Sequence, residues 1–294
     1  MLWTSLFLCY CASRLDGDIS GILMRISGGD EVYAIYKDGH PKDRVRKGMK
    51  LTTDIERLEV GSGCIAYVFD GKSIRAIGPN DRWPKANNGG PTFSKLFAKL
   101  EELFGEKMGQ VSIGGTRGSD APLANLEILA IQPVSEDDGA RVIRVVYAVS
   151  KGLASTVSLE PIGGPLSPVE NSRHIIYAYK NNEVYEWDLS TSAGCSGLAL
   201  DVETMRNNAV QIPTDKPQAP LMMADGVPPR TVTEHLSLAD LMEAEGLRAS
   251  ELEEAYAART LAETPADVIE SDQFLVDLLR RCGSELYASH ITRH

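Results

Sequence analysis

The sequence predicts a mainly β protein with a helical C-terminal tail, and three observations support this. Short apolar runs separated by Gly- and Asp-containing turns recur at roughly 8–12-residue spacing through residues 19–83. A similar pattern returns in residues 123–202, and after a Pro-rich stretch the apolar spacing becomes helical. The expected divisions are a candidate signal segment at 1–16, a β domain at 17–83, a helix and Gly-rich connector at 84–120, a β-sandwich at 121–209, a Pro-rich linker at 210–232 and an acidic helical tail at 233–294.

The clearest local signal is a β-hairpin around Asp70-Gly71, between the apolar runs Cys64–Phe69 and Ser73–Ile77. A type I′ turn needs positive φ at both central residues, and Asp and Gly tolerate that conformation at the least cost. We therefore expect a two-residue turn there. The other strands expected in this domain are Ile19–Ile26, Glu31–Tyr36, Arg44–Leu51 and Arg57–Val60, with turns at Gly28-Gly29-Asp30, Asp38-Gly39 and Gly61-Ser62-Gly63.

The middle of the chain predicts one helix and a second β domain. Thr92 is a plausible N-cap for a helix to Phe104 with one apolar stripe, and Gly105 is suited to end it. The Gly-rich residues 114–118 lack the Gly-Lys-Ser/Thr ending of a phosphate-binding loop, so we interpret them as a connector. The expected strands are Leu126–Ile131, Arg141–Val149, Thr156–Leu159 and a hairpin of Arg173–Lys180 with Glu183–Leu189 across Asn181-Asn182, and the side chains of Tyr177, Tyr179, Tyr185 and Trp187 are expected to pack its core and faces.

The C-terminal part predicts three helices. Ser237 is expected to cap a helix to Glu245 that Gly246 ends, and Ser250 to open a helix over Glu251–Glu263. Thr264-Pro265 has the N-cap and first-position Pro of a helix that runs to Arg281. Residues 213–294 hold 7 Lys+Arg against 15 Asp+Glu, so we expect an acidic helical hairpin or triplet suited to lying on a partner.

Charge and length exclude some classes of function. The net charge is −11 and no segment concentrates basic residues, which argues against nucleic-acid binding. The apolar run at residues 1–13 has the length and small-residue ending of a secretory signal, although no Lys or Arg precedes it. The alternatives are a lipoprotein signal acylated at Cys11 or an apolar strand. The run is too short to span a bilayer, and no later segment reads as a membrane helix.

No motif indicates a catalytic site, a cofactor or a metal centre. Cys64, Cys195 and Cys282 are widely spaced, so each is expected to be a buried apolar-like residue. His174 with Cys195 is the one base–nucleophile pairing that would make a hydrolase. The remaining candidates are each explained by solvated side chains, and they are His290 with His294, Glu136-Asp137-Asp138, Glu251-Glu253-Glu254, and the basic run Arg44-Val45-Arg46-Lys47 on an edge strand.

The turn pattern of the first domain resembles the FecR-type domain of bacteria, which is named for a periplasmic regulator of iron-citrate uptake. The matching segments cover about a quarter of the chain, and they are Gly21-Ile22, residues 47–51, residues 61–66, residues 70–75 and Gly78-Pro79-Asn80. The resemblance implies an extracytoplasmic β domain that senses or scaffolds and is often joined to other modules. The second β domain resembles the fibronectin- or immunoglobulin-like modules that follow such domains in some envelope proteins.

From these features we expect a non-enzymatic bacterial envelope or periplasmic binding or scaffold protein, with signalling as one role. It would act through its β surfaces and acidic helices by binding another protein or, as the second choice, an envelope glycan. A cytoplasmic regulatory subunit of a multiprotein system is the alternative, and a Cys/His hydrolase is the third hypothesis. Whether the protein binds a small molecule is left open by the sequence.

Overall fold

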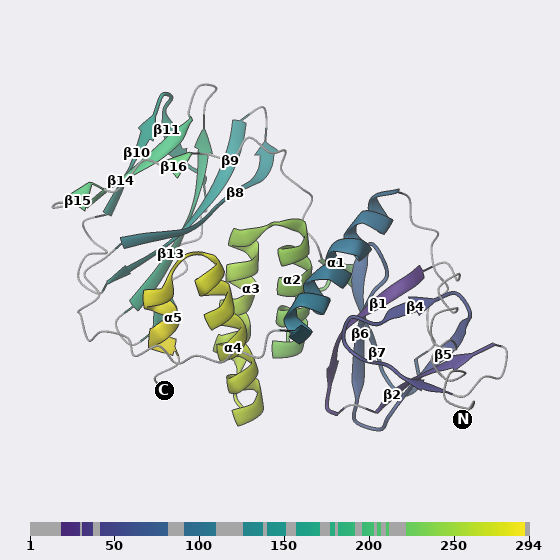
Figure 1. Cartoon of the computed structure of the whole chain (residues 1–294). Helices are drawn as coiled ribbons and strands as arrows, with labels where there is room; N and C mark the ends of the chain where they lie inside the picture. Colours follow the sequence, from purple (N-terminus) through teal and green to yellow (C-terminus); the bar gives the residue numbers. More distant parts are fainter. Residues whose placement is uncertain are drawn as a thin grey trace, which may run out of the picture. The chain divides into compact units, whose positions relative to one another are not determined.

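The computed structural model describes residues 19–29, 31–37, 42–81, 91–109, 126–137, 140–150, 157–170, 177–179, 182–191, 196–202, 205–206, 210–211 and 222–291. The chain forms two compact units (Figure 1). The first comprises Met1–Val111 with Met222–Pro229, and the second comprises Ser112–Leu221 with Arg230–His294. The mainly β prediction, with helices in the C-terminal part, is confirmed. No helix in the described residues is long and apolar enough to cross a membrane.

The first unit is built from two small sheets around one apolar core. One has the order β17-β7-β6-β1-β4 and the other β3-β2-β5. Their inward side chains include Leu23, Val32, Leu58 and Val68, all buried in a single cluster. The strands are β1 (Ile19–Ser27), β2 (Val32–Tyr36), β3 (Asp43–Arg44), β4 (Lys50–Thr52), β5 (Ile55–Val60), β6 (Ile65–Phe69), β7 (Ser73–Ile77) and β17 (Met222–Met223).

The hairpin expected at Asp70-Gly71 forms between β6 and β7, with its loop shifted by one residue. The amide of Asp70 donates to the carbonyl of Ser73 at 3.1 Å, so Gly71 and Lys72 stand at the tip. Gly71 has φ +94°, whereas the Asp70 carboxylate accepts from the amides of Lys72 and Ser73 at 3.0 Å each. Asp70 therefore closes the turn with its side chain instead of occupying a central position.

The strand expected over Arg44–Leu51 is wrong, because this segment divides between the two sheets. It contributes β3 to one sheet and β4 to the other, with a bend between them. Val45 is buried and its amide donates to the carbonyl of Val32 at 2.8 Å. Gly48 has φ +79°, a conformation that glycine adopts readily and that lets the chain turn.

Helix α1 (Pro91–Gly109) covers the other face of the first sheet. The rings of Phe97 and Phe69 lie 5.9 Å apart between centroids, and Leu100 and Phe104 are buried. The expected stop at Gly105 is wrong, since the helix continues to Gly109. A Cβ at Gly105 would meet no atom within 4 Å, so nothing around this position forces the helix to end there.

The Pro-rich segment 210–232 is not the simple linker that its composition predicts. It contains β16 (Val210–Gln211), β17, a short 3-10 helix at Ala224–Gly226 and the first residue of α2. Strand β17 pairs in parallel with β7, and Met223 is buried. The chain therefore returns from the second unit to add a strand to a sheet of the first, where the backbone groups at the edge of β7 offer hydrogen-bond partners.

The second unit contains two sheets. The larger has the order β11-β13-β9-β8, with β12 also paired to β13, and the smaller is β10-β14-β15, with β16 paired to β14. Ile143, Val145 and Tyr147 of the larger sheet share a cluster with Leu198 of the smaller one. The strands are β8 (Leu126–Asp137), β9 (Ala140–Ser150), β10 (Val157–Ile162), β11 (Leu166–Pro168), β12 (Tyr177–Tyr179), β13 (Asn182–Thr191), β14 (Gly197–Val202) and β15 (Met205–Arg206).

The expected hairpin in this unit is confirmed as β12 with β13, in the register Tyr179↔Asn182. Asn182 is therefore already in the strand, whereas the prediction placed it in the turn. Tyr185 is buried against Tyr147, with ring centroids 5.5 Å apart, and Trp187 packs on the same cluster. The side chains of Tyr177 and Tyr179 fall outside the described residues.

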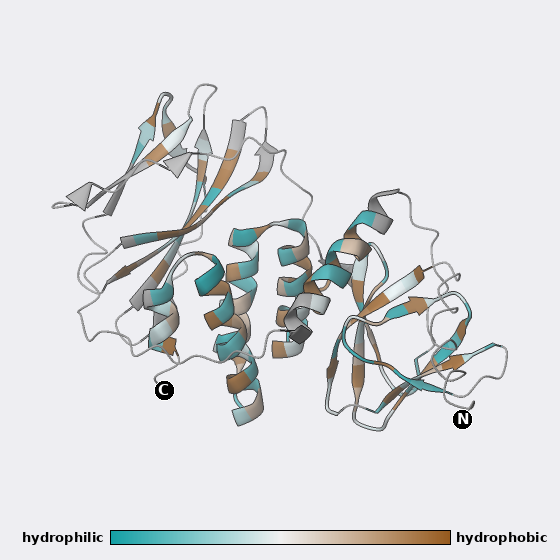
Figure 2. Ribbon diagram, viewed as in Figure 1, coloured by the Kyte–Doolittle hydropathy of each residue, from teal (hydrophilic) through white to brown (hydrophobic). Residues whose placement is uncertain are grey.

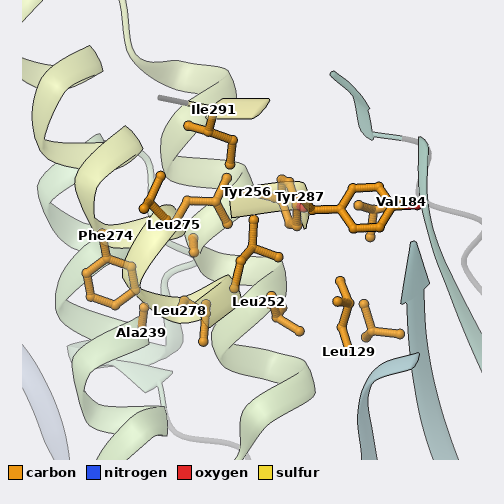
Figure 3. Close-up of a cluster of buried hydrophobic side chains, with 14 of the residues drawn as sticks. Leu129, Val184, Ala239, Leu252, Tyr256, Phe274, Leu275, Leu278, Tyr287 and Ile291 are labelled. Carbon is orange, nitrogen blue, oxygen red and sulfur yellow. The ribbon is translucent and has the colours of Figure 1, made fainter. Parts of the chain in front are cut away.

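The C-terminal helices share a core with the larger sheet, so the expected separate tail at 233–294 is wrong. Leu129 and Val184 of the sheet join Leu252, Leu275 and Tyr287 of the helices in one buried cluster (Figure 3). The cause is that β8, β9 and β13 have a second apolar face, which the helices cover. Figure 2 shows hydrophobic and hydrophilic residues alternating along α4, as a helix with one buried face requires. The helices are α2 (Val232–Glu245), α3 (Arg248–Leu261), α4 (Pro265–Arg281) and α5 (Glu285–Ile291).

The helix boundaries confirm two of the expected signals. Thr264 caps α4 through the amide of Asp267, and Gly246 ends α2 with φ +78°. Ser237 is not a cap, because its hydroxyl donates to the carbonyl of Thr233 inside α2. The cap of α2 is Thr231, which forms a reciprocal capping box with Glu234. Helix α3 begins at Arg248, before the expected start at Ser250.

Candidate functional site

The residues of the hydrolase hypothesis, His174 and Cys195, lie outside the described residues, as do His294 and Asp138. Glu136 and Asp137 end β8, and their side chains are also outside the description. His290 lies in the last turn of α5. Within the described ranges, no group of three or more His, Cys, Asp or Glu side chains is placed to hold a metal ion.

The two described cysteines differ in their surroundings. Cys64 is buried, as expected, and Cys282 is partly buried beside the core of the helices. Both are free thiols. Burial raises the pKa of Cys282 to about 11, so the thiol stays protonated at neutral pH and is a poor nucleophile. Cys282 therefore serves packing.

The acidic run Glu251-Glu253-Glu254 is not the solvated helix face that the sequence suggests. Glu251 is fully buried and accepts from Arg248 at 2.7 Å and from Arg281 at 3.0 Å. Glu254 lies 2.6 Å from Nδ1 of His235 on α2. Each of the three carboxylates has a partner, because α3 packs between the sheet and two helices and leaves little of its surface open.

Glu253 belongs to a buried ion cluster between α3 and the larger sheet of the second unit. Arg144 on β9 donates to Glu253 at 2.7 Å and to Asp188 on β13 at 3.1 Å, and it also pairs with Glu186 of β13. We call these four residues the Arg144 cluster. The exposed fractions of their side chains are 15% for Arg144, 5% for Glu186, 19% for Asp188 and 18% for Glu253.

Strand alternation places the Arg144 cluster on the face that the helices cover. Val145 and Trp187 lie on the opposite face, which packs against the smaller sheet, whereas Val146 and Val184 share the helix-covered face with the cluster. Burial raises the pKa of Glu186, Arg144 opposes that rise, and Glu253 and Asp188 add to it, so that the pKa reaches about 7. One guanidinium thus faces three carboxylates.

Further polar contacts join the helices to β8. Gln132 accepts from the amide of Ser250 at 3.1 Å and donates to its hydroxyl at 2.9 Å. The hydroxyl of Ser284 donates to Glu127. These contacts and the Arg144 cluster hold α3 and the start of α5 against the sheet. This buried polar region therefore has a structural role, and Glu186 is the titratable group within it.

An open surface of a different kind lies on the outer face of the sheet β3-β2-β5. Val32, Ala34 and Tyr36 of β2 point into the core, so the half-buried side chains of Tyr33 and Ile35 lie on the opposite face. In the register of the sheet Tyr33 is paired with Arg44 and Glu59, and Ile35 is paired with Arg57. We define the Tyr33 face as Tyr33, Ile35, Lys42, Arg44, Arg57 and Glu59.

Charged side chains surround the aromatic centre of the Tyr33 face. Nζ of Lys42 lies 4.5 Å from the ring centroid of Tyr33 and 2.9 Å from Glu59. Lys42, Arg44, Arg57 and Glu59 are all exposed, which places three cations and one carboxylate around two partly exposed apolar side chains. An aromatic residue with arginines beside it is the composition enriched at protein–protein contacts.

Comparisons with known protein families, curated proteins and solved structures found no match. The function therefore has to be argued from the Tyr33 face and from the Arg144 cluster. Sequence reasoning named one member of each, Arg44 in the basic run and Glu253 in the acidic run, but neither group as a whole. For the Tyr33 face, the available signal was the alternation of side chains in Glu31–Tyr36. For the Arg144 cluster, it was the pair of acidic residues Glu186 and Asp188, which are two positions apart and therefore lie on the same face of their strand.

Proposed function

We propose that this chain is a non-enzymatic bacterial envelope protein that binds a protein partner through the Tyr33 face of a FecR-like first unit. The observation that carries the proposal is the exposed face itself, where Tyr33 and Ile35 form an apolar centre within a charged rim. Such a rim around a small apolar centre suits a contact that excludes water at its middle and remains polar at its edge.

The FecR resemblance supports the same proposal. Two of the glycines that carry it, Gly48 and Gly71, have positive φ and stand where the chain turns between strands. The resemblance consists of turns of this kind, and β1, β6 and β7 lie between them. An extracytoplasmic scaffold or signalling role follows from the resemblance.

The two facing sheets of the second unit support a fibronectin- or immunoglobulin-like sandwich that has gained a helical layer. The strands and helices of the second unit are held together by a common core of their own. The first unit presents the binding face. Three cations against one carboxylate on that face favour a partner segment with acidic side chains.

The proposal is tested by site-specific photo-cross-linking of the full-length chain. A photoreactive phenylalanine analogue is placed at Ile35 and, as a control, at the exposed Lys99 of α1. We expect a discrete adduct from position 35 that position 99 does not give. The adduct should be lost when Arg57→Glu reverses one charge of the face and kept in Arg57→Lys.

The full chain is needed because removal of the C-terminal part would also remove β17 from the first unit. The same truncation would expose the face of the larger sheet that the helices cover. Equal adducts from positions 35 and 99, or an adduct that persists unchanged in Arg57→Glu, would show that the Tyr33 face is not the binding surface.

A further inference from the structure

The Arg144 cluster connects three elements that only the tertiary structure brings together. Arg144 comes from β9, Glu186 and Asp188 from β13, and Glu253 from α3. It lies where α3 contacts the sheet, beside the bonds between Gln132 and Ser250. A change of charge in the cluster therefore acts directly on the attachment of α3 to the sheet.

The excess of carboxylates over cations in the Arg144 cluster makes the contact between α3 and the sheet sensitive to pH. Three carboxylates meet one guanidinium within the cluster, in a region that is largely closed to water. Like charges at close range in such a site favour protonation of the most buried carboxylate. Glu186 has the smallest exposed fraction of the three, and its pKa of about 7 agrees with that assignment.

We propose that the Arg144 cluster is a proton-controlled latch that holds α3 on the larger sheet more firmly in mild acid than above neutral pH. Protonation of Glu186 removes one of the carboxylate charges that meet at Arg144. Loss of the proton restores the repulsion between β13 and α3. The latch is independent of the Tyr33 face, since each rests on different residues.

The direction of the pH dependence follows from the number of protons bound in the docked and undocked states. The folded-state pKa of Glu186 is raised from 4.5 to about 7, so the docked state binds more protons than a state with Glu186 in water between these values. Docking is thus fully strengthened below the lower value and weakened as pH rises through about 7. The charged groups that face Glu186 in the described residues are Arg144, Asp188 and Glu253.

The size of the pH effect on docking follows from the two pKa values of Glu186, 4.5 in water and about 7 in the folded state. If the undocked state has the ordinary pKa, the equilibrium constant for undocking increases about tenfold between pH 6 and pH 8.

The test is hydrogen–deuterium exchange of the full-length protein at pH 6 and pH 8, with rates corrected for the intrinsic effect of pH. We expect peptides from α3 to be about tenfold more protected at pH 6 than at pH 8 in the wild type. Glu186→Gln, which mimics the protonated side chain, should give the high protection at both pH values. Glu160→Gln, at an exposed position of β10 in the same unit, should behave as the wild type.

Three outcomes would overturn the latch. The first is equal α3 protection at both pH values in the wild type, and the second is an unchanged pH difference in Glu186→Gln. The third is a pH effect in α1 of the first unit as large as that in α3, because it would indicate a general change of stability. If Glu186→Gln does not fold, Asp188→Asn should reduce the pH difference in α3, and an undiminished difference there counts against the latch.

Discussion

Removal of the one cation from the Arg144 cluster tests the energetics of the second unit most directly. Arg144→Met keeps most of the aliphatic length of the side chain but leaves Glu186, Asp188 and Glu253 without their guanidinium partner. Breaking a buried ion pair in this way costs about 3–5 kcal/mol, because the remaining charge is left uncompensated. We expect a free energy of unfolding lower by about that amount at pH 8.

The loss should be smaller at pH 5.5 than at pH 8. Without Arg144 the pKa of Glu186 loses the contact that lowers it and rises further, so that the folded state takes up protons in acid and the repulsion decreases. The assay is urea unfolding followed by circular dichroism at both pH values. With a slope of about 2 kcal/mol per molar urea, a loss of 4 kcal/mol moves the midpoint by about 2 M.

The matched control is Arg280→Met, which makes the same replacement on the surface. Arg280 pairs with Asp277 and Glu285, whose side chains are 63% and 62% exposed, and such surface pairs contribute at most about 1 kcal/mol. If Arg144→Met and Arg280→Met lower the midpoint equally, or if the Arg144→Met loss is the same at both pH values, the electrostatic reasoning is refuted.

Two further predictions concern local structure. Gly48→Ala should destabilise the first unit by about 1–3 kcal/mol, because φ is +79° and the new Cβ would lie 2.8 Å from Phe104 Cβ, whereas Gly105→Ala, in open space on α1, should stabilise it by about 0.5–1 kcal/mol. Thermal unfolding measures both, and a stabilised Gly48→Ala would contradict the geometry. Thr231→Ala should cost about 1 kcal/mol through loss of the capping box, and Ser237→Ala, inside the same helix, should cost less in urea unfolding. Equal losses would show that the cap is unimportant.

Much of the strand pattern was predictable because turns and alternation are local. Ser73–Ile77 and the start of α4 after Thr264 occur as expected, since a Gly-containing turn and a capping residue act within a few positions of themselves. The errors occur where distant elements compete for the same segment. Arg44–Leu51 divides between two sheets, and Met222–Met223 pairs with β7 although its surroundings are rich in proline.

The charged clusters could not have been predicted from composition. Glu251 and Glu253 look solvated in the sequence, because a run rich in Glu usually faces water. Their burial depends on Arg281, which is 30 residues from Glu251 in the chain, and on Arg144 of a distant strand. For the Tyr33 face, alternation alone already puts Tyr33 and Ile35 on one side of β2, but Arg44 and Arg57 join them only through the sheet register.

By itself the sequence determined the positions of most turns, the mainly β character with helices near the C-terminus, and the hairpin between β6 and β7. These features depend on backbone conformations and apolar spacings within about ten residues. Only the tertiary structure decided that the acidic helices form one core with the larger sheet of the second unit, and that the guanidinium of Arg144 faces three carboxylates. Such contacts join residues far apart in the chain, and burial, which changes the energy of every charge, exists only after the elements have packed.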